Sequence, residues 1–345
     1  MMKRKGKLVE QIADLHNLYE AFYKAQKGKQ AKRYVCAYRK QLQENLQLLR
    51  HQILSGAIQT GKYHAFTIYD PKERVICATP FSQRVLHHAI MNVCHPFFEK
   101  HQIAGSFASR KGKGTYAALD KAREYNCCYR WFLKLDVRKY FDSINHTVLQ
   151  KQLTRLFKDK TLLLIFEQII DSYSTADHKG VPIGNLTSQY FANHYLSVAD
   201  HYAKEGLRVP AYVRYMDDMV LWHNEKEELL AMGYMFQTFI AKELLLELKP
   251  FCLNATHKGL PFLGYLLFEN QARLAPRSKK RFLAKYQRYE NNLQSGVWTQ
   301  QEFAKHALPL FAFTEYAQAR EFRKKSLHSF CSLEGVFVRS SKGID

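Results

Sequence analysis

The stretch that decides the fold is YVRYMDDMVLW, residues 212–222. Its apolar residues flank two adjacent aspartates, Asp217 and Asp218, and this pattern predicts a strand, a tight turn and a second strand. Two neighbouring carboxylates repel each other, so the arrangement is unfavourable unless a cation neutralises it. Taken alone, the stretch is also compatible with an ordinary surface turn, and the rest of the sequence decides between these two interpretations.

A third carboxylate, Asp136, lies near the end of another expected strand, FLKLDV, residues 132–137. If the two strand segments pair, Asp136 converges with Asp217 and Asp218. Three carboxylates from neighbouring strands suit a pair of Mg²⁺ ions about 4 Å apart. Such a pair activates a 3′ hydroxyl and holds a pyrophosphate leaving group. The three aspartates therefore predict nucleotidyl transfer.

The chain has 345 residues and is strongly basic, with 52 Lys and Arg against 31 Asp and Glu and a net charge of +21. This excess favours a polyanionic partner, because each neutralised phosphate releases counterions. A solubilising role for the lysines is the simpler alternative. Seven cysteines without a CxxC spacing argue against a disulfide scaffold. Without a long apolar run or a signal core, we expect a cytoplasmic protein with no membrane partner.

Apolar spacing predicts a chain that mixes helices with short strands. The expected helices cover residues 8–22, 42–53, 83–98, 186–202 and 225–245, with further helix in 145–173 and after Arg273. Short strands are expected around residues 66–68, 75–76 and 262–263. Cations are concentrated in a loop at residues 27–33 and in the C-terminal segment at residues 277–288.

Six motifs in this chain resemble, in the same order, those of reverse transcriptases. They are residues 71–88 (PKERVI and then FSQRVLHH), 106–115, 136–141 (DVRKYF), 180–189 (GVPIGNLTSQ), 215–218 (YMDD) and 262–265 (FLGY, similar to the primer grip). Together they span about residues 66–268. Six motifs in order are far more specific than any one of them.

The resemblance implies an α+β fold, the right-hand polymerase with fingers, a ferredoxin-like palm and a small helical thumb. It also implies three consecutive regions. These are an N-terminal helical region at residues 1–60, the fingers and palm of the reverse transcriptase core at 61–268, and a basic helical thumb with a C-terminal tail at 269–345.

The same resemblance assigns roles to individual residues. Asp136, Asp217 and Asp218 are expected to be catalytic and to hold two Mg²⁺ ions together with the Val137 carbonyl, with Mn²⁺ able to replace Mg²⁺. The expected dNTP-binding residues are Lys72, Arg74, Phe141, Ile183 and Gly184, of which Phe141 would exclude a 2′ hydroxyl. The residues expected to contact template or primer are Arg84, Arg110, Lys113, Ser188, Gln189 and Gly264.

One residue departs from the family pattern. The family has a lysine shortly after a proline ahead of the primer grip, as a candidate proton donor to pyrophosphate. Here Lys249 precedes Pro250, and Phe251 and Cys252 occupy the expected place. Lys249 is therefore not assigned as a proton donor.

The motif IGNLTSQ, residues 183–189, resembles that of diversity-generating retroelements, whereas many reverse transcriptases carry Gln-Gly and Ser-Pro at its two ends. These bacterial and phage enzymes copy a template RNA into cDNA with errors at adenines, using dNTPs and a basic accessory protein. Isoleucine at position 183 removes a polar contact, which would lower discrimination. Alternatively, Ile183 only packs and fidelity is set elsewhere.

Two other functions are compatible with this sequence. One is a reverse transcriptase of an antiphage defence system, which makes DNA from a non-coding RNA or without a conventional template. The other is a non-catalytic RNA-binding scaffold. The intact set of Asp136, Asp217 and Asp218 argues against the scaffold.

Overall fold

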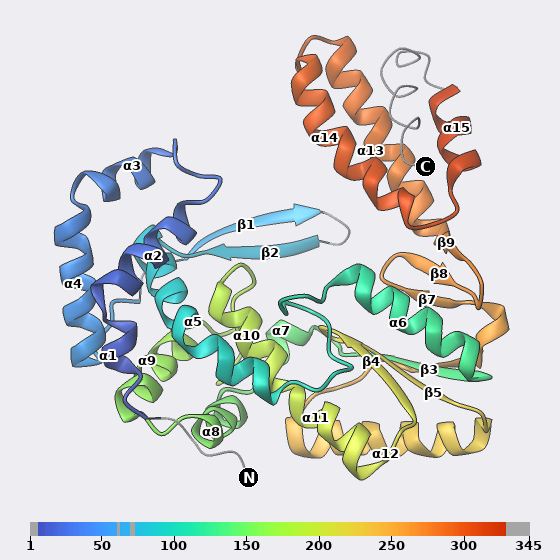
Figure 1. Ribbon diagram of the computed structural model, residues 1–345, viewed down its shortest axis with the longest axis horizontal. Coiled ribbons are helices and arrows are strands. Elements are labelled where there is room, and N and C mark those ends of the chain that lie inside the picture. Colours follow the sequence, from blue (N-terminus) through green and yellow to red (C-terminus); the bar gives the residue numbers. More distant parts are fainter. Residues whose placement is uncertain (1–5, 61–62, 70–72, 329–345) are drawn as a thin grey trace. The chain divides into compact units, whose positions relative to one another are not determined.

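The computed structural model describes residues 6–60, 63–69 and 73–328 (Figure 1). It mixes helices and strands, as the sequence predicts. The chain divides into two compact units. Unit 1 contains residues 1–114, 133–221 and 226–253, and unit 2 contains residues 115–132, 222–225 and 254–345. Within the described ranges, no helix is both long enough and apolar enough to cross a membrane.

A four-stranded sheet in the order β4-β5-β3-β6 carries the three aspartates. Its strands are β3 (Trp131–Asp136), β4 (Ala211–Tyr215), β5 (Asp218–His223) and β6 (Cys252–Ala255). Helices connect β3 to β4, and α12 (Lys226–Leu244) connects β5 to β6. This βαββαβ chain order with these neighbours is the ferredoxin-like arrangement. The expected ferredoxin-like palm is therefore confirmed.

Helix α12 packs against the strands through its smallest residue. A Cβ atom at Gly233 would lie 2.5 Å from Leu133 Cδ1, a distance that real Cβ atoms do not reach. One turn further on, the Phe236 ring meets the Tyr212 ring edge-on at 6.3 Å between centroids. A larger residue at position 233 would therefore have to displace the end of the Leu133 side chain.

The N-terminal part of unit 1 is a helical layer of α1 (Val9–Ile12), α2 (Leu15–Gln26), α3 (Arg33–Lys40), α4 (Leu42–Ser55) and α5 (Phe81–His101). The single helix expected at residues 8–22 is wrong, because Asp14 interrupts it. The backbone of Asp14 is extended, and its carboxylate accepts hydrogen bonds from the amides of His16 and Asn17, which caps α2.

An antiparallel ribbon of β1 (His64–Tyr69) and β2 (Glu73–Ala78) lies between α4 and α5 in the chain, with Phe66 opposite Ile76. Both strands were expected from the sequence. The remaining helices of unit 1 are α7 (Tyr140–Ser143), α8 (His146–Leu156), α9 (Lys160–Asp171), α10 (Leu186–Tyr195), α11 (Ser197–His201) and the π-helix η1 (Tyr202–Gly206).

Unit 2 contains α6 (Thr115–Cys128), the 3₁₀ turn η2 (Thr256–Lys258) and a three-stranded sheet of β7 (Leu260–Phe262), β8 (Tyr265–Leu267) and β9 (Ala272–Leu274). Three helices follow, α13 (Pro276–Gln294), α14 (Gln300–Glu315) and α15 (Arg320–His328). These helices form the helical segment expected after Arg273.

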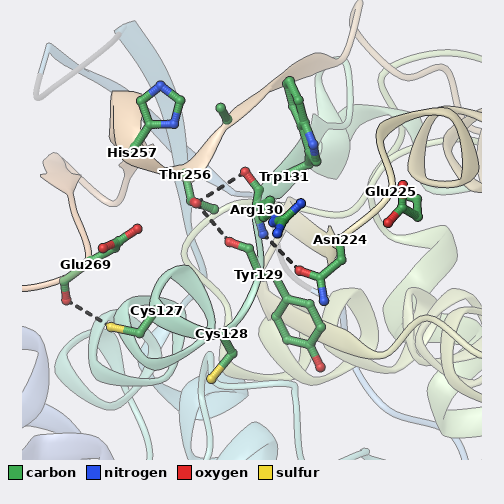
Figure 2. A pocket seen from close by; sticks show the side chains of 11 residues that line it. Cys127, Cys128, Tyr129, Arg130, Trp131, Asn224, Glu225, Thr256, His257 and Glu269 are labelled. Atoms are coloured by element: carbon green, nitrogen blue, oxygen red, sulfur yellow. Dashed lines mark hydrogen bonds between the residues drawn. The ribbon is translucent and has the colours of Figure 1, made fainter.

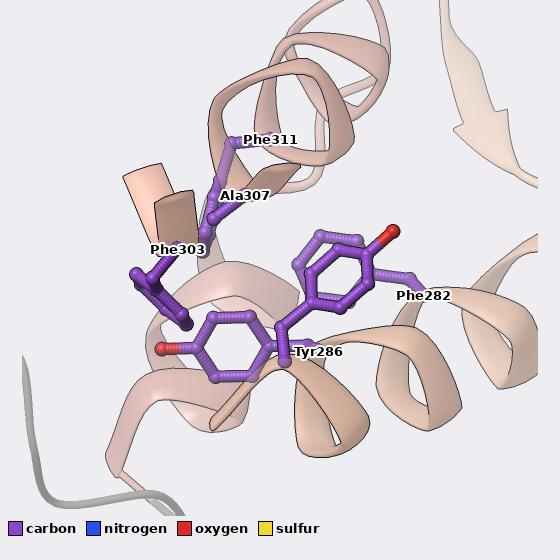
Figure 3. Close-up of a cluster of buried hydrophobic side chains, with 6 residues drawn as sticks. Phe282, Tyr286, Phe303, Ala307 and Phe311 are labelled. Atoms are coloured by element: carbon purple, nitrogen blue, oxygen red, sulfur yellow. The ribbon is translucent and has the colours of Figure 1, made fainter. Parts of the chain in front are cut away.

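Helices α13 and α14 share an aromatic core of their own (Figure 3). Phe282 is 1% exposed, and its ring meets Phe311 edge-on at 5.4 Å between centroids. Tyr286 stacks beside Phe282 at 6.0 Å and also meets Phe311. The cations of α13 can therefore face solvent while its aromatic face holds the two helices together.

We predict that Phe282→Ala loosens this helix pair. Removing a buried phenyl ring leaves a cavity, so the opening free energy of α13 and α14 should fall by about 3–5 kcal/mol. Hydrogen exchange on the whole chain measures that free energy segment by segment. Leu308→Ala on α14, where the side chain is 53% exposed, is the matched control and should change little. Equal exchange in wild type and Phe282→Ala would contradict this core.

Candidate active site

The two adjacent aspartates lie where β4 turns into β5. Strand β4 ends at Tyr215 and β5 begins at Asp218, so Met216 and Asp217 form the turn. Met216 has a φ of 53°, in the left-handed region that non-glycine residues seldom adopt. Asp136 ends β3, which is the neighbour of β5 in the sheet. The fold thus brings the three aspartates to adjacent strands.

The electrostatics of the turn follow from this crowding. Burial, together with the negative charges of Asp218 and Asp136, raises the pKa of Asp217 to about 6. A hydrogen bond from its own backbone and the charge of Lys249 act in the opposite direction. A carboxyl group in this state gains from any added positive charge beside it.

Two lysines supply positive charge to the other carboxylates. Lys249 Nζ lies 2.7 Å from Asp136 Oδ2, and Lys134 Nζ lies 3.1 Å from Asp218 Oδ1. Lys249 is held there by the backbone, because its amide donates to the Asp136 carbonyl at 2.9 Å. The family pattern gave Lys249 no role, because that pattern depends on the order of residues along the chain. The contact of Lys249 with Asp136 depends instead on how the segments pair in space.

The donor set fits a divalent cation in its chemistry. Within the described ranges, no group of three or more His, Cys, Asp or Glu residues already forms a metal-binding cluster. However, Asp136 Oδ1 is buried without a hydrogen-bond partner, and buried polar atoms are rarely left so. Carboxylate oxygens are the ligands that Mg²⁺ prefers. Asp136, Asp217 and Asp218 could therefore hold such an ion, and Val137, which directly follows Asp136, is buried.

Backbone hydrogen bonds connect the residues expected to bind dNTP. The Phe141 carbonyl accepts from the Val181 amide at 2.9 Å, and the Cys77 amide donates to the Ile183 carbonyl at 2.8 Å. Gly184 follows with a φ of 121°, and a Cβ there would lie 3.1 Å from Ile76. The loop after Gly180 is thereby fixed against β2.

Arg74 is an exposed residue of this same strand, β2, opposite Ile68. The structure thus brings Arg74, Phe141, Ile183 and Gly184 into one hydrogen-bonded group of segments. Lys72 lies outside the described residues.

The loop cations Arg110 and Lys113 make their contacts within the chain. Arg110 donates to Glu99 at 2.6 Å and to the carbonyls of Ile103 and Ser106, and its side chain is 8% exposed. Lys113 donates to the Ala104 carbonyl and lies over the Phe107 ring at 4.7 Å. Both side chains therefore shape their own loop, and the template contact expected of Arg110 and Lys113 stays a prediction.

The other residues expected to contact template or primer occupy varied surroundings. Ser188 is buried in α10, whereas Gln189 beside it is exposed. Arg84 on α5 is partly buried, with Nη1 unpartnered.

Gly264 lies in unit 2, in the two-residue turn between β7 and β8, where Leu263 and Gly264 both have positive φ. This is the turn that suits the twist of a tight hairpin. The Gly264 carbonyl accepts from Ser278 Oγ at 2.7 Å, which ties the hairpin to α13.

A pocket of about 750 Å³ in unit 2 contains none of these residues (Figure 2). Several of its polar groups are already used. Thr256 Oγ1 donates to the Tyr129 carbonyl at 2.8 Å, and Cys127 Sγ donates to the Glu269 carbonyl at 3.1 Å. The pocket also mixes acidic and basic side chains, so it offers no match to a nucleic acid.

Comparison with known proteins agrees with the geometry of the sheet. A family model described as reverse transcriptase (RNA-dependent DNA polymerase) matches residues 69–267, more than half of the chain. The chain belongs to the reverse transcriptase family. The matched residues include all three aspartates and the whole of β2, so the chain carries the domain of an RNA-directed DNA polymerase with the right-hand fold.

Relatives of this reverse transcriptase domain occur in bacteria and eukaryotes. Protein YkfC of Escherichia coli is 26% identical over 175 residues, which cover 46% of this chain and 45% of YkfC. Nuclear intron maturase 1, mitochondrial, of Arabidopsis thaliana is 29% identical over 87 residues, or 25% of this chain and 12% of the maturase. The chain thus spans less than half the length of these relatives.

Among solved structures, telomerase from Candida albicans in complex with the TWJ fragment of telomeric RNA aligns with a TM-score of 0.48. The sequence identity is 16%, over 79% of this chain and 55% of that chain.

The reverse transcriptase motifs do not include Arg214, whose side chain supports the YMDD turn. Arg214 is fully buried and forms an ion pair of 2.6 Å with the equally buried Asp200 of α11. Its Nη1 donates to the Met216 carbonyl at 3.1 Å and to Asn193 Oδ1 at 2.8 Å. Tyr212 donates to the same Asp200 at 2.8 Å. An arginine inside an apolar strand is the sequence signal that could have revealed this network.

We predict that Asp200→Asn destabilises this reverse transcriptase by about 3–5 kcal/mol, because the Arg214 charge stays buried without its counter-charge. The free energy of unfolding in denaturant measures the loss. Asp177→Asn, at a carboxylate that is 96% exposed, is the control and should leave stability unchanged. A loss below about 1 kcal/mol for Asp200→Asn would show that the pair is dispensable.

Proposed function

We propose that this chain is an RNA-directed DNA polymerase that extends a primer 3′ end with dNTPs on an RNA template. The observation that carries the proposal is the position of Asp136 on the strand beside the Asp217–Asp218 turn, within a domain of the reverse transcriptase family. The net charge of +21 supports a nucleic-acid substrate.

The chain's own residues divide the work. Asp136, Asp217 and Asp218 would hold two Mg²⁺ ions, with the Val137 carbonyl nearby. When bound, these ions supply Lewis-acid activation of the primer hydroxyl and charge for the leaving pyrophosphate. Lys249 keeps an ammonium group against Asp136 and so limits the repulsion among the carboxylates.

We further propose that the enzyme is error-prone and of the diversity-generating retroelement type. The IGNLTSQ sequence at residues 183–189 supports this subtype. The Ile183 carbonyl bonds to β2, so its side chain is not needed to hold the loop. A template RNA, its cDNA product and a basic accessory protein would then be the partners, in the cytoplasm of a bacterium.

Loss of one carboxylate should abolish polymerisation. Asp217→Asn removes charge that the metal ions require, while it also relieves repulsion, so the fold should persist. Primer extension on an RNA template measures activity, and circular dichroism checks the fold. Asp171→Asn, at a carboxylate that is 51% exposed, is the control. Extension at the wild-type rate by Asp217→Asn would refute the proposed polymerase and favour an RNA-binding scaffold.

Phe141→Ala should admit ribonucleotides. The phenyl ring would exclude a 2′ hydroxyl by overlap, so its removal should lower the preference for dNTP over rNTP about tenfold, or about 1.4 kcal/mol in transition-state free energy. Single-nucleotide incorporation on one template gives the ratio. The partly buried Phe97 offers a control, because Phe97→Ala on α5 should leave the ratio unchanged. An unchanged ratio for Phe141→Ala as well would make Phe141 a packing residue only.

Ile183→Gln should improve accuracy at template adenines. One added neutral hydrogen bond is worth about 0.5–1.5 kcal/mol, so errors should fall several-fold. Sequencing of cDNA from an adenine-containing RNA measures the error per incorporation. Ile183→Leu, which adds no polar group, should keep the wild-type errors. Equal errors in wild type and Ile183→Gln would place infidelity elsewhere, and an accurate wild type would favour the antiphage defence function.

A further inference from the structure

One strongly basic part of unit 1 lies outside all six motifs. Residues 21–43 contain seven Lys and Arg and no Asp or Glu. They cover the second half of α2, the turn at residues 27–32 and all of α3 (blue in Figure 1). One third of the net charge of the chain is therefore concentrated in this segment, which we call the α2–α3 surface.

The cations of this surface are exposed and mostly unpaired. Within residues 6–60, 63–69 and 73–328, the structure gives no acidic partner to five of them, which are Lys27, Lys29, Lys32, Arg33 and Lys40. Lys24 pairs with Glu20 at 2.7 Å, and Arg39 donates to Gln26 at 2.6 Å. Unpaired neighbouring cations repel one another, so the segment gains from a polyanion.

Two tyrosines stand out among these cations. Tyr23 on α2 is 62% exposed, and Tyr34 on α3 is 48% exposed. Exposed aromatic rings offer flat faces on which the bases of a single strand can stack. A membrane-binding helix would instead need a continuous apolar face, whereas the exposed residues of α3 are mainly charged.

The rings beneath hold this surface in place. Phe22 stacks with Tyr38 at 6.0 Å between centroids, and both meet Phe81, at the start of α5, edge-on. Val35 is fully buried on the inner side of α3. Because α3 is anchored by these contacts, Tyr34 and its neighbouring cations are presented in a fixed arrangement, which lowers the entropic cost of binding.

We propose that the α2–α3 surface binds single-stranded RNA, with phosphates on the cations and bases on Tyr23 and Tyr34. This proposal goes beyond the proposed polymerase function, because no residue of the α2–α3 surface is among those predicted to be catalytic or to bind dNTP, template or primer. The surface would hold RNA that is not itself being copied at the active site.

The test uses the full chain with its active site filled. A hairpin primer–template with a short overhang is added at saturation, and a labelled 20-nucleotide oligouridine is then titrated, with binding followed by fluorescence anisotropy. Tyr23→Ala with Tyr34→Ala should weaken oligouridine binding about tenfold or more. Lys29→Gln with Lys32→Gln should reduce the slope of log affinity against log salt by about 1.4, or 0.7 for each lost phosphate contact.

Matched controls separate this surface from general effects. Tyr234→Ala removes another exposed tyrosine, which is 58% exposed. Lys151→Gln with Lys160→Gln removes two other exposed charges. Both controls should bind oligouridine like wild type. Extension of the short hairpin should be unchanged in every variant, and a loss of oligouridine binding with normal extension supports the proposal independently of the polymerase mechanism.

Three results would overturn the proposal. The first is wild-type oligouridine affinity in the Tyr23→Ala/Tyr34→Ala variant. The second is an equal loss in the control variants, which would show a general charge or stability effect. The third is preferential binding of phosphatidylserine vesicles that the same tyrosine variant abolishes, which would assign the surface to a membrane.

Discussion

The buried ion pair of Arg214 and Asp200 is the interaction on which the turn at Asp217 and Asp218 depends. Burying two charges is costly, and it is tolerated only when the remaining donors and acceptors are also satisfied. Each of the three guanidinium nitrogens of Arg214 donates a hydrogen bond, to partners on α10, α11 and the loop at Ser106. A further hydrogen bond from Nη1 reaches the carbonyl of Met216, whose backbone lies in the left-handed region. The position of Asp217 therefore depends on the buried pair of Arg214 and Asp200.

At the three aspartates of the candidate site, negative charges outnumber positive ones. Three carboxylates gather on adjacent strands, and two ammonium groups, from Lys134 and Lys249, offset part of their repulsion. Lys134 lies two residues before Asp136 on β3, so the two side chains share one face of the sheet. From this face Lys134 contacts Asp218 on the neighbouring strand β5. The pKa of Asp217 is raised mainly by burial, and the charges of Asp218 and Asp136 add to this effect while Lys249 opposes it. A site with an unsatisfied carboxylate and oxygen ligands is suited to receive a hard cation.

Backbone hydrogen bonds connect the segments around the expected nucleotide. The carbonyls of Phe141 and Ile183 are the groups that bind neighbouring segments. These contacts use backbone atoms, so they do not depend directly on the residue type at positions 141 and 183. Arg110 is the opposite case, since its guanidinium is used to hold its own loop together. The side chain of Arg110 thus has a structural role within its loop.

The sequence by itself determined the elements that local patterns encode. The strand–turn–strand at 212–222 and the ribbon of β1 and β2 follow from apolar alternation and turn residues, and motif order then indicated the fold. The break at Asp14 was missed, because a single capping residue inside a continuous apolar pattern leaves the periodicity unchanged.

Only the tertiary structure decided which distant groups meet. Arg214 and Asp200, and likewise Lys249 and Asp136, are brought together by helix packing and strand pairing. The ion pair of Arg110 with Glu99 is another contact of this kind. Contacts of this kind depend on where whole elements pack, and residue type and spacing along the chain do not encode that placement. The three aspartates of the candidate site could therefore be found in the sequence, whereas the charges that support them could not.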